Sequence, residues 1–398
     1  MCCCEFSSPH SGDNFKKTGF YQKLGFCHGN QLYNLPQSNS RRESMKINFA
    51  MWRRAMWELI KMDDKNEWDA LDVVSKWLIA TRSAVTTVTI YSCIIAGLLA
   101  WRDGFFSWGP FLVVTLSLFI AHGTNNLLND YTDFSRGVDK DNYFRTQYGV
   151  HPLVQGFWTK SQQIQWFIAS GILAILGGVY ALQYTGFNPY IIGLFVFGAL
   201  VLLFYTWPLK YWALGEFAIF LIWGPIMIAG VYFVLALGAG EHNPVNLWNV
   251  ALAGIPFGLS VASINVGKHI DKMQDDKAKG VGTFPVRVGE KFARAVNQFA
   301  VIATYAVIIY LVVVHYFTPI MLIVFFAIKR ALLVIGVLNK PRPAEPPKEW
   351  PAWPTWFSGF AFYHNRMFGG LLLLGLLLDS ALRVIPFTAD FLAKYWPM

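Results

Sequence analysis

NNLLNDYTDFSRGVDKD, residues 125–141, begins at the end of the apolar run 108–128. A second polar segment, NVGKHIDKMQDDKAKGVGTFPVRVG at residues 265–289, begins in the same way at the end of the apolar run 247–265. Seven of the fifteen aspartates in the chain lie in these two segments. An apolar run of about twenty residues is long enough to cross a bilayer. The two segments therefore predict clusters of carboxylates at the membrane boundary of a polytopic membrane protein.

The composition supports this class of protein. The chain has 398 residues, of which 55% are hydrophobic and 14% are charged, whereas about a quarter of the residues in a typical soluble protein are charged. These values exclude a disordered chain, a coiled coil and a small disulfide-bonded domain. The net charge of +9 indicates basic cytoplasmic loops, so no binding to nucleic acid is expected. The five cysteines have no paired spacing and indicate neither a zinc site nor a disulfide framework.

Nine apolar runs of spanning length predict nine transmembrane helices and an all-α fold. They cover residues 82–101, 108–128, 163–183, 189–206, 216–238, 247–265, 295–315, 317–338 and 367–387. The even-numbered loops between them contain four, one, seven and four Lys or Arg residues, and the odd-numbered loops contain one, none, none and none. Because cytoplasmic loops are enriched in Lys and Arg, this asymmetry predicts a cytoplasmic N-terminus, cytoplasmic aspartate-rich segments and an external C-terminus.

The part of the chain before the first span divides into two regions. Residues 1–48 are polar and without hydrophobic period, which predicts a disordered tail. Translation from Met45 and a genuine flexible tail both stay open. Residues 49–77 predict an amphipathic cytoplasmic segment, and residues 78–398 form the transmembrane domain.

The spacing of the polar residues suggests a shared binding site. Asn126, Asp130 and Asp133 lie on one face while the helix persists, because residues three and four apart are neighbours on a helix. Asp271 and Asp275 repeat this spacing, with Asp276 adjacent. Mg2+ prefers oxygen ligands and usually binds one or two carboxylates together with substrate phosphate. Cations are interleaved with these acids: Arg136, Lys140, Arg145, Lys268 and Lys272. The pattern predicts a site for a diphosphate held by Mg2+; the alternative is solvated loops whose charges only fix the topology.

The motifs NDYTDFSRGVD (residues 129–139) and DKMQDDKAKGVGTFPVRVG (residues 271–289), on nine helices, resemble the UbiA superfamily of intramembrane prenyltransferases. Within this superfamily, the sequence is most similar to the branch of the 1,4-dihydroxy-2-naphthoate polyprenyltransferases. The step from Asp133 to Asp139 through a glycine, the run ALGEFAIFLIWGPIMIAGVYFV from Ala213 and the tail TFPVRVG carry that likeness. The resemblance implies a bundle of nine transmembrane helices around a central cavity, in which residues 78–398 form a prenyltransferase domain.

The resemblance also implies roles for individual residues. Metal binding is expected at Asn126, Asp130, Asp133, Asp271, Asp275 and Asp276. Diphosphate binding is expected at Asn126, Arg82, Arg136, Lys140, Arg145, Lys210 and Lys268. The residues implied to be catalytic are Asp130, Asp271, Asp275 and Tyr205. Asp276 lies four residues before Gly280, the spacing usual in the family, so Asp275 and Asp276 both stay candidates for the metal.

The function implied is Mg2+-dependent transfer of a prenyl group from a polyprenyl diphosphate to an aromatic acceptor, 1,4-dihydroxy-2-naphthoate of menaquinone synthesis. Residues 142–156, NYFRTQYGVHPLVQG, differ from the usual continuation in this branch. Other acceptors therefore stay open: 4-hydroxybenzoate, homogentisate, a tetrapyrrole or a lipid precursor. A secondary transporter is a further alternative, although transporters bind their substrates near the bilayer midplane. The expected location is an integral position in a lipid bilayer, which is the plasma membrane if the source is bacterial.

Overall fold

The computed structural model describes residues 47–140, 144–242, 247–347, 350 and 353–396. The predicted tail at residues 1–48 lies almost entirely outside the described residues. Within them the regular structure is helical throughout, and no strand occurs. The predicted all-α fold is therefore confirmed.

Eight helical segments are long and apolar enough to cross a membrane. They are α5 (Ser83–Arg102), α6 (Trp108–Ser135), α7 (Lys160–Tyr184), α9 to α10 (Gly215–Gly238), α11 (Leu247–Asp271), α14 (Glu290–Val313), η4 to α15 (Pro319–Leu338) and α16 (Phe357–Val384). The ninth predicted span corresponds to the shorter apolar helix α8 (Pro189–Phe204). Every predicted span thus has a helix, and the count of nine is approximate because α8 has only 16 residues.

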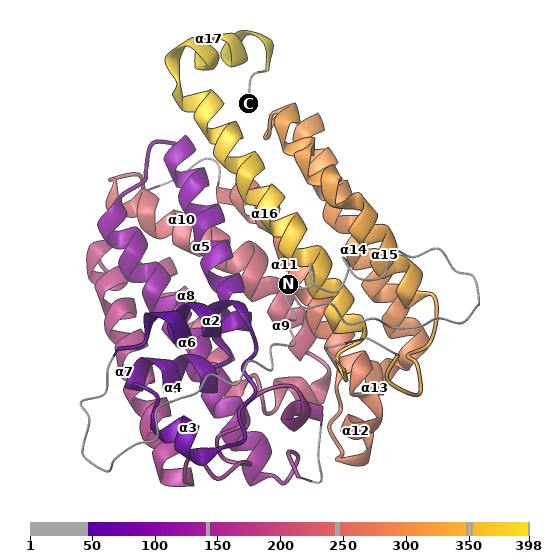
Figure 1. Cartoon of the computed structure of the whole chain (residues 1–398). Helices are drawn as coiled ribbons and strands as arrows, with labels where there is room; N and C mark the ends of the chain where they lie inside the picture. The colour runs from indigo at the N-terminus through magenta and orange to yellow at the C-terminus, as the bar shows by residue number, and fades with distance from the viewer. Residues whose placement is uncertain (1–46, 141–143, 243–246, 348–349, 351–352, 397–398) are drawn as a thin grey trace, which may run out of the picture.

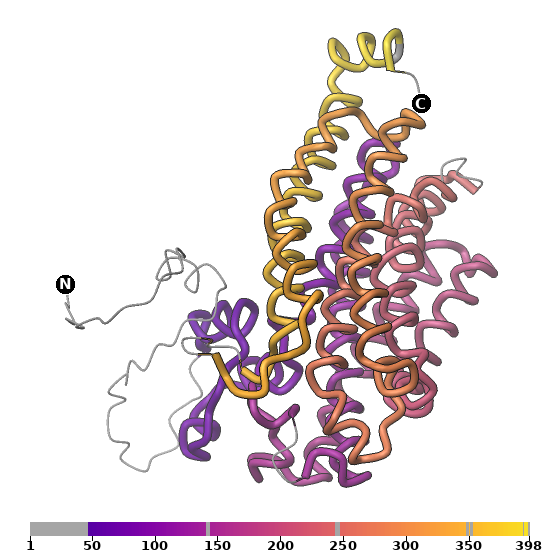
Figure 2. The backbone as a smooth tube through the Cα atoms, turned by 90° about the vertical axis from the view of Figure 1, so that its right-hand side faces the viewer, coloured from indigo at the N-terminus to yellow at the C-terminus, as the bar shows by residue number. Residues whose placement is uncertain are grey.

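Short helices lie at the ends of the long ones. They are α2 (Phe49–Trp57), α3 (Lys65–Asp69), α4 (Val73–Ala80), η1 (Phe144–Gln147), η2 (Leu209–Trp212), α12 (Met273–Ala278), α13 (Phe284–Val288) and α17 (Pro386–Tyr395). Figure 1 shows α3, α12 and α13 at one end of the bundle and α17 at the other. In Figure 2 the N-terminal helices, in indigo, lie against one side of the bundle near the former end.

Two helices extend beyond the apolar runs that predicted them. α16 begins at Phe357, ten residues before the predicted start of its span, and its added turns carry polar side chains that have partners inside the bundle. The His364 ring hydrogen-bonds the Tyr305 hydroxyl at 2.9 Å, and the Asn365 amide donates to Ser260 at 3.0 Å. α11 continues to Asp271, so the second aspartate-rich segment starts on a helix.

The fifth span is broken in its middle. Gly224 has φ −105° and ψ −110°, outside the helical region, and Pro225 follows it. The backbone here lies directly against α11, since a Cβ built on Gly224 would meet the Cα of Gly258 at 2.8 Å. The break also frees the Trp223 carbonyl, which accepts a hydrogen bond from Ser92 at 2.6 Å. Glycine at 224 therefore allows α5, α11 and the break to pack closely.

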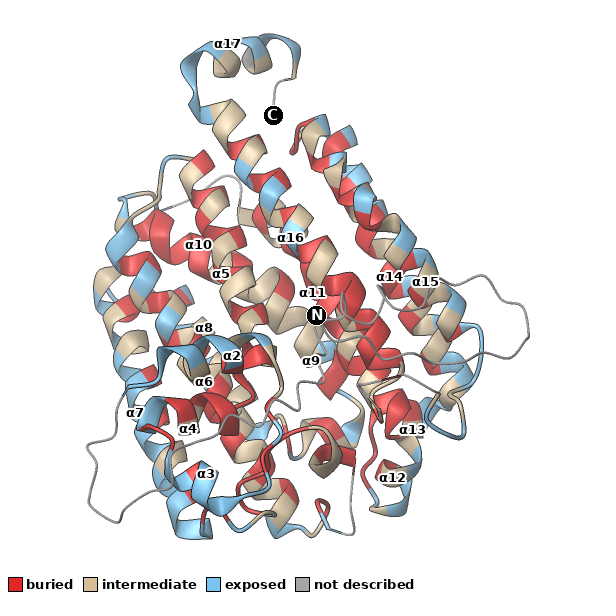
Figure 3. Cartoon of the chain, in the orientation of Figure 1, coloured by how far each residue is buried: buried red, intermediate tan, exposed pale blue. Residues whose placement is uncertain are grey.

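The core follows the contacts among α5, α10, α11, α14 and α16, with Phe257 and Phe368 fully buried. In contrast, α7 and α8 contain many exposed residues (Figure 3), and apolar residues are among them; Ile172 of α7 and Leu200 of α8, for example, are 53% and 49% exposed. A helix that is apolar on its outer face as well as its inner face suits a lipid environment.

Candidate active site

The two aspartate-rich segments meet at the end of the bundle where α12 and α13 lie (Figure 1). The first segment occupies the last turns of α6 and the loop to η1, and the second occupies the last turns of α11 and α12. Their side chains form a set of buried ion pairs around a polar cavity.

Asp130 is paired with two guanidinium groups. Its carboxylate, 1% exposed, lies 3.2 Å from Arg82 Nη2 and 2.7 Å from Arg145 Nη2. Arg82 precedes α5 with φ +57°, a left-handed conformation that is uncommon for a residue with a side chain. Arg145 comes from η1, and its Nη1 has no hydrogen-bond partner. The geometry joins three predicted site residues in one cluster.

Arg145 of this cluster and the neighbouring Tyr148 have shifted pKa values. Burial works to lower the pKa of Arg145, but Asp130 and Tyr148 outweigh it and raise the pKa, so the guanidinium stays charged. Burial works to raise the pKa of the Tyr148 phenol, but Lys268, Arg145 and Arg82 outweigh it and lower the pKa. The surroundings of Tyr148 are thus strongly cationic.

Asp133 is held by Lys210, which η2 supplies from the loop after α8. The Lys210 ammonium lies 2.8 and 2.7 Å from the two carboxylate oxygens of Asp133, and both residues are buried. Further along the first segment, Asp139 is paired with His151 at 2.8 Å. Each described carboxylate of this segment therefore faces a basic group.

The second segment divides between two faces of the helix. Asp271 accepts hydrogen bonds at 2.9 to 3.0 Å from the amides of residues 356–358 and one at 2.7 Å from the Ser358 hydroxyl, so it caps the start of α16. Asp275 interacts electrostatically with Arg342 on the same side. On the other side, Asp276 accepts from Lys272 at 2.7 Å and from Thr283 at 3.0 Å. From the sequence alone, the face that carries Asp271 and Asp275 could not be told apart from the face that carries Asp276.

Two predicted diphosphate ligands lie at the surface. Arg136 is exposed at the end of α6, and its guanidinium lies over the rings of Trp207 and Tyr211, 5.4 and 5.2 Å from the centroids. Lys140 is also exposed. The structure therefore brings neither side chain to the buried cluster.

The polar cavity has a volume of about 200 Å³ and lies among α5, α6, α11 and α16. Its polar lining comes mainly from Arg82, Asn126, Asn129, Tyr148, Asn265 and Lys268. Asn265 is buried, and its Nδ2 has no hydrogen-bond partner. Asp130, Asp133 and Asp276 are not among the lining residues. Glu58 also lines the cavity and is paired with Arg54 at 3.1 Å, so the polar lining consists mainly of donors and cations, which suits an anionic ligand.

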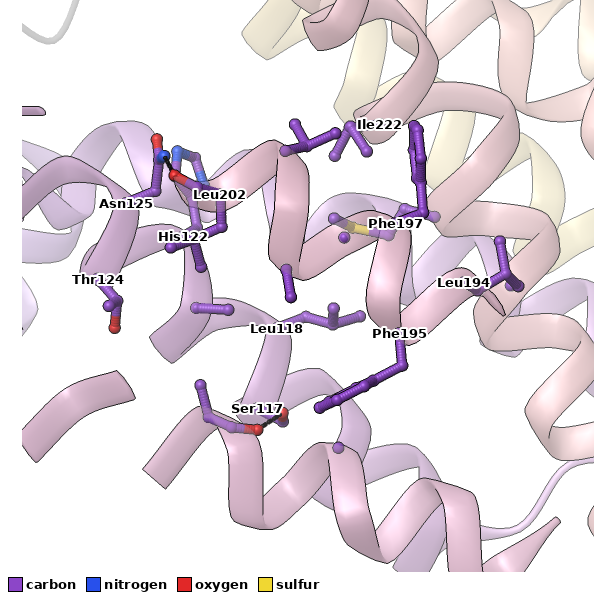
Figure 4. A pocket seen from close by; sticks show the side chains of 18 of the residues that line it. Ser117, Leu118, His122, Thr124, Asn125, Leu194, Phe195, Phe197, Leu202 and Ile222 are labelled. Atoms are coloured by element: carbon purple, nitrogen blue, oxygen red, sulfur yellow. Dashed lines mark hydrogen bonds between the residues drawn. The ribbon is translucent and has the colours of Figure 1, made fainter. Parts of the chain in front are cut away.

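A second cavity of about 370 Å³ lies beside the first, among α6, α7, α8 and α9 to α10. Figure 4 shows its apolar walls, with Leu118, Phe195 and Ile222 pointing inward. Its few polar groups have partners; the Asn125 amide, for example, donates to the Leu202 carbonyl at 2.7 Å. Both cavities share one wall, formed by His122, Asn125, Tyr205, Ile219 and Trp223. The site thus places a polar chamber against an apolar one, with Tyr205 between them.

The UbiA prenyltransferase family model matches residues 90–365. The chain belongs to this family. It is 26% identical over 278 residues to the 1,4-dihydroxy-2-naphthoate octaprenyltransferase of Bacillus subtilis, covering 68% of this chain and 81% of the relative. It is 24% identical over 238 residues to the 2-carboxy-1,4-naphthoquinone phytyltransferase of Synechocystis, covering 58% and 72%. Among solved structures, the apo structure of a UbiA homolog from Aeropyrum pernix K1 aligns with a TM-score of 0.53 at 16% identity, covering 72% of this chain and 97% of the homolog.

These likenesses confirm the predicted family, and the enzyme class that goes with it. The chain is an integral membrane prenyltransferase of the UbiA family. The structural likeness supports the helical fold alone. Two of the relatives carry names of naphthoate prenyltransferases, as the spacing of the motifs had suggested.

The first UbiA motif carries three side chains with oxygen atoms that suit magnesium, and in this structure its two carboxylates are paired with Arg82, Arg145 and Lys210. Asn126, Asp130 and Asp133 offer oxygen ligands along one face of α6, and Mg2+ commonly takes one or two carboxylates with substrate phosphate. Among the residues that the structure describes, however, no three acidic, His or Cys side chains are grouped closely enough to hold a metal by themselves. Metal binding at this UbiA site would therefore need oxygen atoms from the substrate.

A buried acid and base, which the sequence did not predict as a pair, lie beside the second motif. Glu216, at the start of α9, hydrogen-bonds His269 of α11 through Oε1, and the Phe284 amide donates to the same oxygen at 3.1 Å. Glu216 is the only acidic residue of the run ALGEFAIFLIWGPIMIAGVYFV, which was a signal available in the sequence. Its Oε2 has no hydrogen-bond partner.

Proposed function

We propose that this chain transfers a prenyl group from an isoprenoid diphosphate to an aromatic acceptor with Mg2+, and that the acceptor is 1,4-dihydroxy-2-naphthoate. The observation that carries the proposal is the pair of adjoining cavities, one lined with cations and the other apolar. An isoprenoid diphosphate has the same two parts, an anionic head and an apolar chain. The naphthoate acceptor rests on the names of the relatives.

In this proposal the polar cavity holds the diphosphate. Arg82, Lys268, the Tyr148 hydroxyl and the free Nδ2 of Asn265 are donors that line it. Asn126, Asp130 and Asp133 would hold the Mg2+, whose chemistry is to neutralise charge on the diphosphate oxygens. Arg136 and Lys140, at the surface, would contribute only a long-range attraction for the anion.

The reaction begins when the bond between the allylic carbon and the diphosphate oxygen breaks. The electron pair leaves with the diphosphate, where fixed cations and donors stabilise the developing negative charge. The allylic carbon becomes cationic at the shared wall, next to the aromatic rings of Tyr205 and Trp223. Aromatic faces attract cations, so these rings would stabilise the carbocation while the apolar cavity holds the chain.

An electron-rich carbon of the acceptor ring then forms the new carbon–carbon bond. With 1,4-dihydroxy-2-naphthoate, the same ring carbon loses its carboxyl group as carbon dioxide; with an acceptor whose ring carbon carries hydrogen, that carbon passes a proton to water. Either loss restores aromaticity. Asp130 and Tyr205 keep catalytic roles in this scheme. For Asp271 and Asp275 we propose positioning roles, because they lie towards α16 and Arg342.

A labelled prenyl diphosphate tests the proposal. Membranes that contain the protein, supplied with labelled geranylgeranyl diphosphate and Mg2+, should form a labelled lipid with 1,4-dihydroxy-2-naphthoate and not without an acceptor. A panel with 4-hydroxybenzoate and homogentisate would show whether the acceptor is assigned correctly. Absence of a product with every aromatic acceptor would contradict prenyl transfer itself.

We also propose that the motif end of the bundle faces the cytoplasm, since the basic loops lie there. With the cysteines at positions 2, 3, 4 and 27 replaced by serine and the buried Cys93 left in place, the variants Lys140→Cys and Asp390→Cys should label differently with an impermeant maleimide. The reagent should reach position 390 from outside intact cells and position 140 only after the membrane is opened. The reverse pattern would invert the topology.

A further inference from the structure

In the second motif, a lysine lies next to the buried carboxylate that faces the first motif. Lys272 and Asp276 are four residues apart and form an ion pair at 2.7 Å, with side-chain exposures of 5% and 0%. Asp271 and Asp275, which have the carboxylate spacing expected of a metal site, lie on the other face. On the face towards the first motif, the helix therefore presents an ammonium beside a carboxylate.

Lys272 is buried beside the polar cavity but is not among its lining residues. It interacts electrostatically with Asp133 of the first motif, with Tyr205 at the shared wall and with Lys268 of the cavity lining. Asp276 and Thr283 hold this arrangement, since Thr283 donates to the second oxygen of Asp276 at 3.0 Å. A positive charge is thus fixed between the two motifs.

This charge has consequences for metal binding. A second Mg2+ at Asp276 would need at least one further oxygen ligand on this face, and the neighbour four residues earlier is a cation that repels it. A lysine ammonium binds phosphate oxygens as a point charge, so it can provide the electrostatic part of what a metal provides.

We infer that the Lys272 ammonium takes the place of a magnesium ion in the second motif, so that the diphosphate is bound with metal at the first motif alone. The inference rests on the proposed function, because it concerns how the same site holds its diphosphate. It makes this chain a prenyltransferase whose substrate binding is linked to one Mg2+, with a fixed protein charge on the other side.

The test measures binding rather than turnover. Geranyl S-thiolodiphosphate, which ionises very slowly, is titrated by calorimetry into the detergent-solubilised full chain over a series of Mg2+ concentrations, with EDTA for the metal-free point. By linkage, the slope of log Kd against log Mg2+ concentration gives the number of ions taken up with the ligand. We expect a slope of about 1 in magnitude for the wild type.

Three variants of Lys272 sharpen the test. Lys272→Met should weaken binding by about tenfold at every Mg2+ concentration, because a charge-assisted contact is lost. Lys272→Asp should raise the slope to about 2, because two carboxylates four residues apart can share an ion. Lys272→Arg keeps the charge and should bind within about threefold of the wild type. Lys277→Met, at an exposed position of α12, the helix that Lys272 directly precedes, is the matched control and should bind like the wild type.

The outcomes separate the inference from the function on which it rests. A slope of about 2 for the wild type, or unchanged affinity in Lys272→Met, would overturn the inference and leave prenyl transfer standing. If the methionine variant does not fold, as judged by thermal unfolding, the Asp and Arg variants decide. A wild-type chain that binds no analogue at any Mg2+ concentration would overturn the proposed function as well.

Discussion

Asp130 connects two basic residues of the site. It is buried and accepts contacts from Arg82 and Arg145, two guanidinium groups that arrive from different parts of the chain. A buried carboxylate between two cations is costly to remove, because each cation would then be buried without its partner. Asp130 therefore stabilises the fold in addition to any contact that it makes with Mg2+ or substrate.

Asp130→Asn keeps the shape of the side chain and removes its charge. We expect prenyl transfer to fall by about a hundredfold or more, and the unfolding free energy to fall by about 3 kcal/mol, since one partner of a buried pair is lost. Steady-state kinetics and thermal unfolding in detergent measure the two effects. Asp69→Asn, at an exposed position whose carboxylate is paired with Lys65, is the control. Full activity in Asp130→Asn would remove Asp130 from the site.

The aspartates of the second motif show what the sequence could and could not predict. Their number and position after an apolar run predicted a polar site at the helix end, and the structure places the segment beside the first motif. The sequence could not show which of Asp271, Asp275 and Asp276 faces that motif. This depends on α11 ending at Asp271 and on the start of α16 lying within hydrogen-bond distance, which are tertiary facts.

Asp271→Ala should lower the stability of the protein and leave the rate of prenyl transfer almost unchanged. It removes the acceptor for three amides and a hydroxyl at the start of α16, and loss of a helix N-cap costs about 1 kcal/mol. We expect a lower melting temperature and a kcat close to the wild-type value for the folded enzyme. Asp271→Ser, which keeps a capping oxygen, should recover part of the stability. Loss of turnover at an unchanged melting temperature would instead indicate a direct catalytic role.

Among the elements, the helices were predictable because apolar runs of spanning length are a strong signal. Their ends were not. His364 and Asn365 interrupt the apolar pattern of α16, and only their partners on α14 and α11, Tyr305 and Ser260, explain why the helix continues through them. The break at Gly224 is likewise a matter of packing against Gly258 of α11. Sequence periodicity carries no information about such pairings.

The N-terminal helices give a prediction about pH. Asp72 caps α4 through the Val74 and Ser75 amides and also accepts from Trp52 of α2 at 3.0 Å. Burial works to raise its pKa, but the hydrogen bonds outweigh it and lower the pKa from 3.8 to about 2. A depressed pKa means that the folded state favours the charged form, so the stabilisation is complete above about pH 4 and is lost as the pH falls towards 2.

Thermal unfolding of the wild type and of Asp72→Asn between pH 2 and 6 measures this contribution. The wild type should melt at a higher temperature near pH 6, and most of the difference should be lost near pH 2, where Asp72 is about half protonated in the folded state and almost fully protonated in the unfolded state. Asp64→Asn serves as a control, because Asp64 caps only the short helix α3 and is exposed. A difference in melting temperature that does not change with pH would show that the charge of Asp72 contributes nothing.

At the scale of the whole molecule, the bundle brings a cationic chamber and an apolar chamber together across one wall. Neither chamber belongs to a single helix: the polar one lies among α5, α6, α11 and α16, and the apolar one among α6, α7, α8 and α9 to α10. Such an arrangement accounts for the uneven distribution of charge along the sequence, because the polar residues gather where the ends of distant helices meet.

If the apolar cavity holds the prenyl chain, filling it should shorten the chain that the enzyme accepts. Gly198 of α8 lines this cavity, and a Cβ built there has no heavy atom within 4 Å. Gly198→Phe should therefore be accommodated in the helix, where glycine is a poor helix former. We expect kcat/KM for geranylgeranyl diphosphate to fall by about tenfold relative to geranyl diphosphate, as the longer chain loses apolar contacts. Gly193→Phe is the matched control, since Gly193 is on the same helix, has the same open surroundings and does not line the cavity. An equal chain preference in both variants would place the prenyl chain elsewhere, along the side of the polar cavity formed by Val85, Val88 and Phe362.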